Sequence, residues 1–126
     1  VAYAIGKAHP VGLFVAGLGP LVANDVYAPP AIWERFEKDQ YHSPRVVWGR
    51  EVNLLFLGLA AKSLRPELDR ILAAVNASGL QHNELWSYRI EGGRLVPTRY
   101  GAGSDVQLWS TTDLAVQFMM SRILRR

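Results

Sequence analysis

The chain has 126 residues, of which 49% are apolar and 20% charged, so it has enough apolar material for one folded domain and is not a disordered segment. It contains no Cys, which excludes disulfides, thiolate nucleophiles and Cys-built zinc sites; the compartment stays open, with the cytoplasm favoured. The net charge of +3 comes from scattered arginines, so no nucleic-acid partner is expected.

The first predicted element is the apolar segment 8–24. Its apolar run, residues 11–23, is shorter than the ~20 residues that a membrane span needs, so we expect a core segment and no membrane partner. Gly and Pro interrupt it, which predicts one or two short helices with a break near Gly19-Pro20. Because Val1 opens the chain in place of Met, we expect a processed, truncated or incomplete start and no signal peptide.

Three helices and a polar connection follow. Pro30 favours a helix start, which predicts a helix over 31–38, and residues 39–47 form the connection. Residues 50–61 are apolar on nearly every side, which is typical of a helix buried all round. Residues 66–77 carry one apolar stripe and one charged face, with Gly79 as the C-terminal stop.

Residues 80–103 have no helical periodicity. The segment 87–97 contains two short extended runs around Gly92-Gly93, which predicts a long loop or a short β-hairpin near residues 85–99. Ser104 followed by Gln107 has the spacing of a capping box, so the last helix is expected to begin there and run, mostly buried, to about residue 125.

Taken together, these elements favour an all-α fold over residues 1–126. Two mostly buried helices alternate with an amphipathic outer helix, which suggests antiparallel helical hairpins in concentric layers, with inner helices covered by outer ones.

The most informative candidate site surrounds Glu84. Aromatic residues Trp86 and Tyr88 follow it closely, and Trp109 stands after the Gly-rich stretch that leads to the last helix. A carboxylate held in a loop among aromatic rings is suited to activating water in a sugar-cleaving site, because aromatic faces stack on pyranose rings. Glycoside hydrolysis is therefore the leading hypothesis.

Two blocks of the chain resemble a known family. Residues 39–54 contain Tyr41, a short turn, Val47-Trp48 and the acidic Glu51, and residues 57–60 continue with Gly58-Leu59. Residues 83–111 contain Glu84, the Gly-Gly turn and a final segment with Trp109. In this order the blocks resemble the C-terminal part of six-hairpin (α/α)6-toroid glycosidases, which include glycogen-debranching, mannosyl-oligosaccharide and trehalose hydrolases. Gly49 departs from the pattern, which usually has Pro after the first Trp.

The resemblance implies that the chain is part of such a toroid and that Glu84 is the general base of an inverting hydrolase. It also implies that aromatic side chains line the sugar pocket, with an acidic residue near it. Arg and Gln side chains would bind sugar hydroxyls. The candidate substrate-binding residues are Tyr41, His42, Trp48, Arg50, Glu51, Trp86, Gln107 and Trp109. No cofactor and no metal is expected.

The general acid is the missing half of the predicted reaction. In the family it is an Asp far upstream, so here the candidates are Glu51, Asp105, Asp113 or a residue of another protomer. About five helices cannot close a toroid of twelve. We therefore expect a homo-oligomer or a missing remainder of the enzyme, since unpartnered apolar helices leave an exposed patch.

Several alternatives stay open. A non-catalytic helical module that binds carbohydrate or oligomerises would show the same aromatic residues, and each Trp could simply belong to the core. His9, His42 and His82 have no ligand spacing, which argues against a metal site. The serines lack the context of a hydrolase nucleophile, and the glycines lack the spacing of a phosphate-binding loop.

Overall fold

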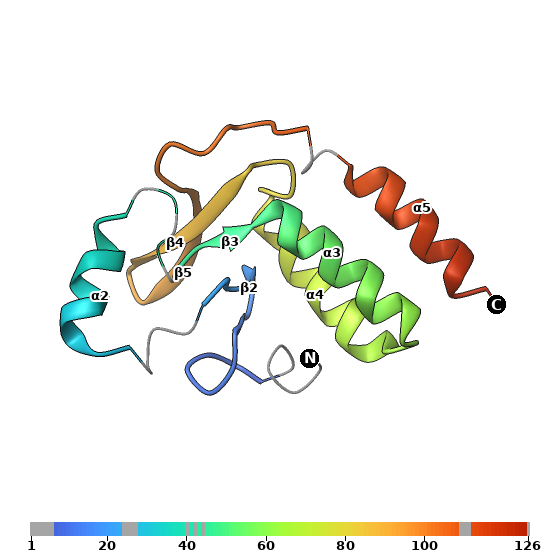
Figure 1. Ribbon diagram of the computed structural model, residues 1–126, viewed down its shortest axis with the longest axis horizontal. Helices are drawn as coiled ribbons and strands as arrows, with labels where there is room; N and C mark the ends of the chain where they lie inside the picture. The colour runs from blue at the N-terminus through green and yellow to red at the C-terminus, as the bar shows by residue number, and fades with distance from the viewer. Residues whose placement is uncertain are drawn as a thin grey trace.

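The computed structural model describes residues 7–23, 28–39, 41, 43, 45–108 and 112–125. Over these residues the fold is mixed α/β, with four helices and two antiparallel sheets of five strands in all. The expected all-α toroid is therefore wrong. Figure 1 shows a central sheet with two helices against it, a third helix along their outer side and α2 at the opposite end.

The N-terminal segment forms a small hairpin instead of helices. Strand β1 (Phe14–Val15) pairs with β2 (Gly19–Pro20) in antiparallel register. Gly17 and Gly19 have φ angles of 76° and 120°, which a helix cannot contain. Leu18 in the turn of this hairpin is completely buried, so the segment contributes to the core as a turn and not as a helix. The prediction of helices over 8–24 is wrong because the glycines specify a turn at this point.

Helix α2 (Pro30–Glu37) agrees with the expected helix. Pro30 occupies its first turn, where the missing N–H costs nothing. None of its residues is fully buried. The guanidinium of Arg45 lies 5.0 Å from the Trp33 ring centroid and 3.5 Å from Glu37 Oε1, which connects the helix to the chain that follows.

The larger sheet contains β3 (Val47–Trp48), β4 (Leu85–Glu91) and β5 (Arg94–Arg99), in the order β3-β4-β5. β4 and β5 form the hairpin predicted from the Gly-Gly turn, and Gly92 and Gly93 have φ angles of 55° and 77°. In the register, Trp86 stands opposite Val47 on one side and Arg99 on the other. This pairing brings the two blocks of the sequence next to each other.

Helices α3 (Gly49–Ala61) and α4 (Arg65–Ser78) pack side by side (Figure 1). The apolar stripe of α4 faces the core as predicted, and Gly79 ends the helix with φ 68°. Helix α3, however, is not buried all round. Val52, Phe56 and Leu59 are buried, whereas Leu54 is 52% exposed.

Helix α5 (Asp113–Ile123) begins eight residues later than predicted, because its N-cap residue is Thr112 in place of Ser104. It lies along α3, against which it buries Val116 and Met120. Phe118 on its outer face is 60% exposed, so the expectation of a helix buried on most sides is also wrong. Residues 104–108 are a loop.

One core joins these elements. Trp86 is completely buried and packs in a cluster with side chains of β1, α3, α4 and α5, including Phe14, Phe56, Ile71 and Val116. Among the described residues no helix has both the length and the apolar character needed to cross a membrane.

Candidate functional site

Glu84 lies immediately before β4, between the start of α3 and the loop 100–108. Its carbonyl accepts a hydrogen bond from the Gly49 N–H at 3.0 Å, and its own N–H donates to the Ser104 carbonyl at 3.0 Å. Two segments that are distant in sequence therefore fix the Glu84 backbone. The side chain is half-buried.

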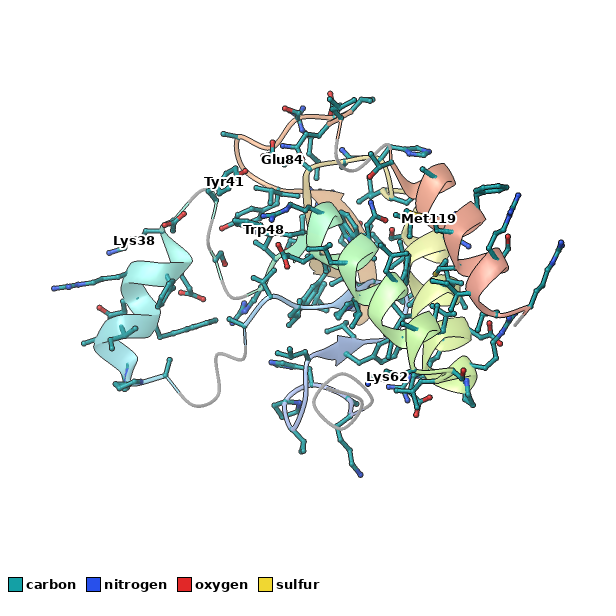
Figure 2. All side chains as sticks on the ribbon, turned by 45° about the vertical axis from the view of Figure 1, so that its right-hand side comes forward. Lys38, Tyr41, Trp48, Lys62, Glu84 and Met119 are labelled. Atoms are coloured by element: carbon teal, nitrogen blue, oxygen red, sulfur yellow. The ribbon has the colours of Figure 1, made fainter. Side chains whose placement is uncertain are left out.

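Both oxygens of the Glu84 carboxylate accept hydrogen bonds from protein donors. The Tyr41 hydroxyl donates to Oε1, and the Ser104 N–H donates to Oε2 at 3.0 Å. Figure 2 shows Glu84 and Tyr41 beside each other at one edge of the molecule, with Trp48 near them. Hydrogen bonds from two different loops define the direction of this carboxylate.

These bonds favour the ionised carboxylate. The Tyr41 hydroxyl is the largest cause that lowers the pKa of Glu84, followed by the Ser104 N–H; desolvation opposes them, and side-chain bonds with Gln107 and Ser104 lower it further. Because the folded-state pKa lies below the unfolded value, the ionised form stabilises the fold above the unfolded pKa. That stabilisation is lost as the pH falls through the folded-state pKa.

Tyr41 is itself held in place. The Asp39 Oδ1 accepts a hydrogen bond from the Tyr41 N–H at 2.7 Å, and the Tyr41 carbonyl accepts one from Trp48 Nε1 at 3.3 Å. The Tyr41 and Trp48 rings meet edge to face, with centroids 5.0 Å apart and an interplanar angle of 73°. The bond with Glu84 raises the pKa of the Tyr41 hydroxyl.

The loop that supplies the Ser104 N–H depends on a close approach at Gly103. A Cβ atom at this residue would lie 3.0 Å from Cβ of Leu85, so a side chain would push the loop away from β4. Arg99 holds the loop from the strand, because its Nη2 donates to the Gly103 carbonyl at 2.7 Å and its Nε lies 2.9 Å from Asp105 Oδ1.

Trp48 also lines a groove of about 450 Å³. Among the described residues, Glu51 is the acidic residue of its lining, and the others are apolar: Leu13, Pro20, Leu21, Val22, Val52 and Leu55, together with Trp48. Glu84 does not line this groove. Trp48 therefore contacts Tyr41 and also borders the groove.

The remaining predicted substrate-binding residues are placed differently. Trp86 is completely buried and its Nε1 donates to the Leu18 carbonyl at 3.1 Å, so it is a core residue with no surface for a ligand. Arg50 and Glu51 are exposed, with Arg50 Nη1 3.5 Å from Glu51 Oε1. Gln107 is half-buried beside Glu84. His42 and Trp109 lie outside the described residues.

The structure also places the candidates for the general acid in different environments. Asp105 is paired with Arg99, and the side chain of Asp113 lies outside the described part of the chain. Glu51 is paired with Arg50 and is the candidate that lies at the groove, on the first turn of α3. The described residues contain no group of three or more His, Asp or Glu side chains arranged to hold a metal ion.

The sequence did not predict the role of Ser104. The capping-box spacing predicts that Ser104 caps a helix, whereas its N–H donates to the side chain of Glu84, twenty residues earlier. The Gly101 and Gly103 pair is the signal that could have indicated a tight loop here, since Gly101 has φ 51° and Gly103 packs against Leu85. Comparison with known proteins found no matching family model, curated protein or solved structure.

Proposed function

We propose that the chain takes part in the hydrolysis of glycosidic bonds, with Glu84 as the base that activates water. The observation that carries this proposal is the carboxylate held at both oxygens, by Tyr41 and by the Ser104 N–H. A base must be ionised and correctly directed before substrate arrives. The hydrogen bonds that lower the pKa of Glu84 meet both requirements near neutral pH.

The Glu84 carboxylate can accept a hydrogen bond from water in exchange for a side-chain donor. An ionised carboxylate offers about four lone-pair positions; the Tyr41 hydroxyl and the Ser104 N–H each bind one oxygen, and the side chains of Gln107 and Ser104 also donate to the carboxylate. Glu84 is half-buried, so solvent reaches the site. A group that stays ionised is suited to the base of an inverting glycosidase, whereas the acid needs a raised pKa.

Glu51 is the candidate acid within the described residues. It lines the apolar groove with Trp48, and Trp48 packs on the tyrosine that binds Glu84. Inverting hydrolysis requires the two carboxyl groups to be ~6.5–9.5 Å apart, with the water between one of them and the sugar. A carboxyl group of another protomer is the alternative donor.

The test is turnover by Glu84→Gln on a panel of p-nitrophenyl glucosides and mannosides, trehalose and maltotriose. We expect kcat to fall by about a hundredfold or more, since positioned bases contribute at least that much. Glu91→Gln is the matched control, because Glu91 is an exposed carboxylate at the hairpin end, paired with Arg89 at 3.2 Å. Unchanged kcat in Glu84→Gln would remove the proposal. The kcat of Glu51→Gln on trehalose tests whether Glu51 is the general acid.

A second candidate function is carbohydrate binding without catalysis. It is favoured by the fact that protein donors already occupy both oxygens of Glu84, as they would in a purely structural bond between two loops. Wild-type protein that binds maltotriose in an NMR titration and converts none of the panel would support this function over hydrolysis.

A further inference from the structure

We infer that Tyr41 is a positioning residue for Glu84, fixing the direction and the ionised state of its carboxylate through one hydroxyl hydrogen bond. The catalytic role in this inference rests on the proposed function. The sequence predicts that Tyr41 binds substrate, whereas we infer that it acts on the reaction through Glu84. The hydroxyl of Tyr41 donates to Glu84 Oε1.

A positioning residue must be held more firmly than the group it positions. Tyr41 is held at three points: its N–H by Asp39 at 2.7 Å, its carbonyl by Trp48 Nε1 at 3.3 Å, and its ring by the edge-to-face contact with Trp48. A tyrosine side chain has few rotatable bonds, so these anchors fix its hydroxyl as well. Trp48 therefore contributes to the site by supporting Tyr41.

The opposite oxygen is held by a donor of a different kind. The Ser104 N–H belongs to the backbone of a loop that Gly103 brings against Leu85. No side-chain substitution at 104 removes this N–H, apart from proline. Among the side-chain donors to Glu84, Tyr41 has the largest effect on its pKa, and its hydroxyl can be removed without changing the Ser104 N–H.

Charged groups surround this pair on several elements. Asp39 precedes Tyr41, the Arg50 and Glu51 pair begins α3, His82 stands two residues before Glu84, and Arg99 and Asp105 are paired at the loop. None of them is among the causes that lower the pKa of Glu84, which are hydrogen bonds. Removing the Tyr41 hydroxyl should therefore raise the pKa of Glu84, with little compensation from ion pairs.

The experiment is an NMR titration of the Glu84 side-chain carboxyl carbon in wild-type protein and in Tyr41→Phe. We expect the midpoint to move to higher pH in the variant. The acid limb of the kcat/KM profile on the active p-nitrophenyl glycoside should move with it, and kcat should fall about tenfold while KM changes less than about twofold. Tyr88→Phe is the matched control, since Tyr88 is a half-buried tyrosine of β4 and should leave both midpoints unchanged.

A second measurement needs no variant. In wild-type protein the Cζ resonance of Tyr41 should shift with the Glu84 midpoint, whereas that of Tyr88 should not. An unchanged Glu84 midpoint in Tyr41→Phe, or a Tyr41 resonance that ignores the Glu84 titration, would overturn the inference even if the protein is an active hydrolase. A shifted midpoint in a protein that hydrolyses none of the panel would remove the proposed function and leave the positioning bond established.

Discussion

Trp86 and Trp48 lie one register position apart in the β3-β4 pair, so their side chains point to opposite faces of the sheet and have different environments. The first is completely buried and bonded to the Leu18 carbonyl, whereas the second is half-buried between Tyr41 and the groove. The sequence places both near candidate sugar-binding positions, because aromatic residues are typical of sugar sites and of cores alike. The strand register decides which of the two tryptophans is buried in the core, and the sequence alone does not show that register.

We expect Trp86→Phe to destabilise the fold by about 1–3 kcal/mol, because it leaves the buried Leu18 carbonyl without its donor. Chemical denaturation monitored by circular dichroism measures this. Trp33→Phe is the control, since Trp33 lies half-buried on α2, and should change the free energy of unfolding by about 0.5 kcal/mol at most. A stable Trp86→Phe protein with altered KM would instead indicate a ligand-binding Trp86.

At the scale of elements, the loop 100–108 matters most, because it carries the Ser104 N–H to Glu84. Its path depends on the contact between Gly103 and Leu85 and on the bonds from Arg99. Leu85 belongs to β4 and Arg99 to β5, so the β4-β5 hairpin holds the loop that carries the Ser104 N–H.

Gly103→Ala should cost about 1–3 kcal/mol, since the new methyl group would lie 3.0 Å from Leu85 and the loop or the strand must shift. It should also raise the pKa of Glu84 by weakening the Ser104 bond. Gly58→Ala is the opposite case within α3, because its Cβ would meet nothing within 4 Å, and a helix-interior alanine should stabilise by about 0.5–1 kcal/mol. Thermal denaturation of both variants measures the contrast, and equal effects would contradict it.

The sequence predicts some elements better than others for physical reasons. Helices α2 and α4 and the hairpin at Gly92 are specified by local signals, namely proline at a helix start, one apolar stripe and a Gly-Gly turn. The start of α5 is not: Ser104 has the local pattern of a helix cap, but the Gln107 N–H that it would cap donates to the His82 carbonyl, and the Ser104 carbonyl accepts from the Glu84 N–H. Tertiary contacts override the cap.

At the scale of the whole molecule, the outer face of α3 and α5 is apolar and exposed. Leu54 is 52% exposed on α3, and Phe118 and Met119 are 60% and 44% exposed on α5. Figure 2 places Met119 on this outer helix. An apolar sequence pattern makes these helices resemble inner helices of a toroid, because a pattern cannot reveal whether a partner covers the face. The predicted fold class is wrong because it also lacks the strands β1, β2 and β3.

We expect the protein to self-associate through this α3/α5 face, because contiguous exposed apolar surface favours burial against a second molecule. Sedimentation equilibrium should give a mass that rises with concentration. Phe118→Glu should shift the distribution toward monomer, whereas Ile90→Glu, which changes a 64% exposed residue on β4, should not. A wild-type chain that is monomeric at high concentration would contradict this expectation.

The central claim is that Glu84 activates water, and chemical rescue tests it most directly. Glu84→Ala should lose about a hundredfold or more in turnover of the active p-nitrophenyl glycoside. Sodium azide, a nucleophile that needs no base, should then restore release of p-nitrophenol and yield a glycosyl azide of inverted anomeric configuration. Turnover in Glu84→Ala equal to that of wild type, or a complete failure of azide to restore it, would contradict the account.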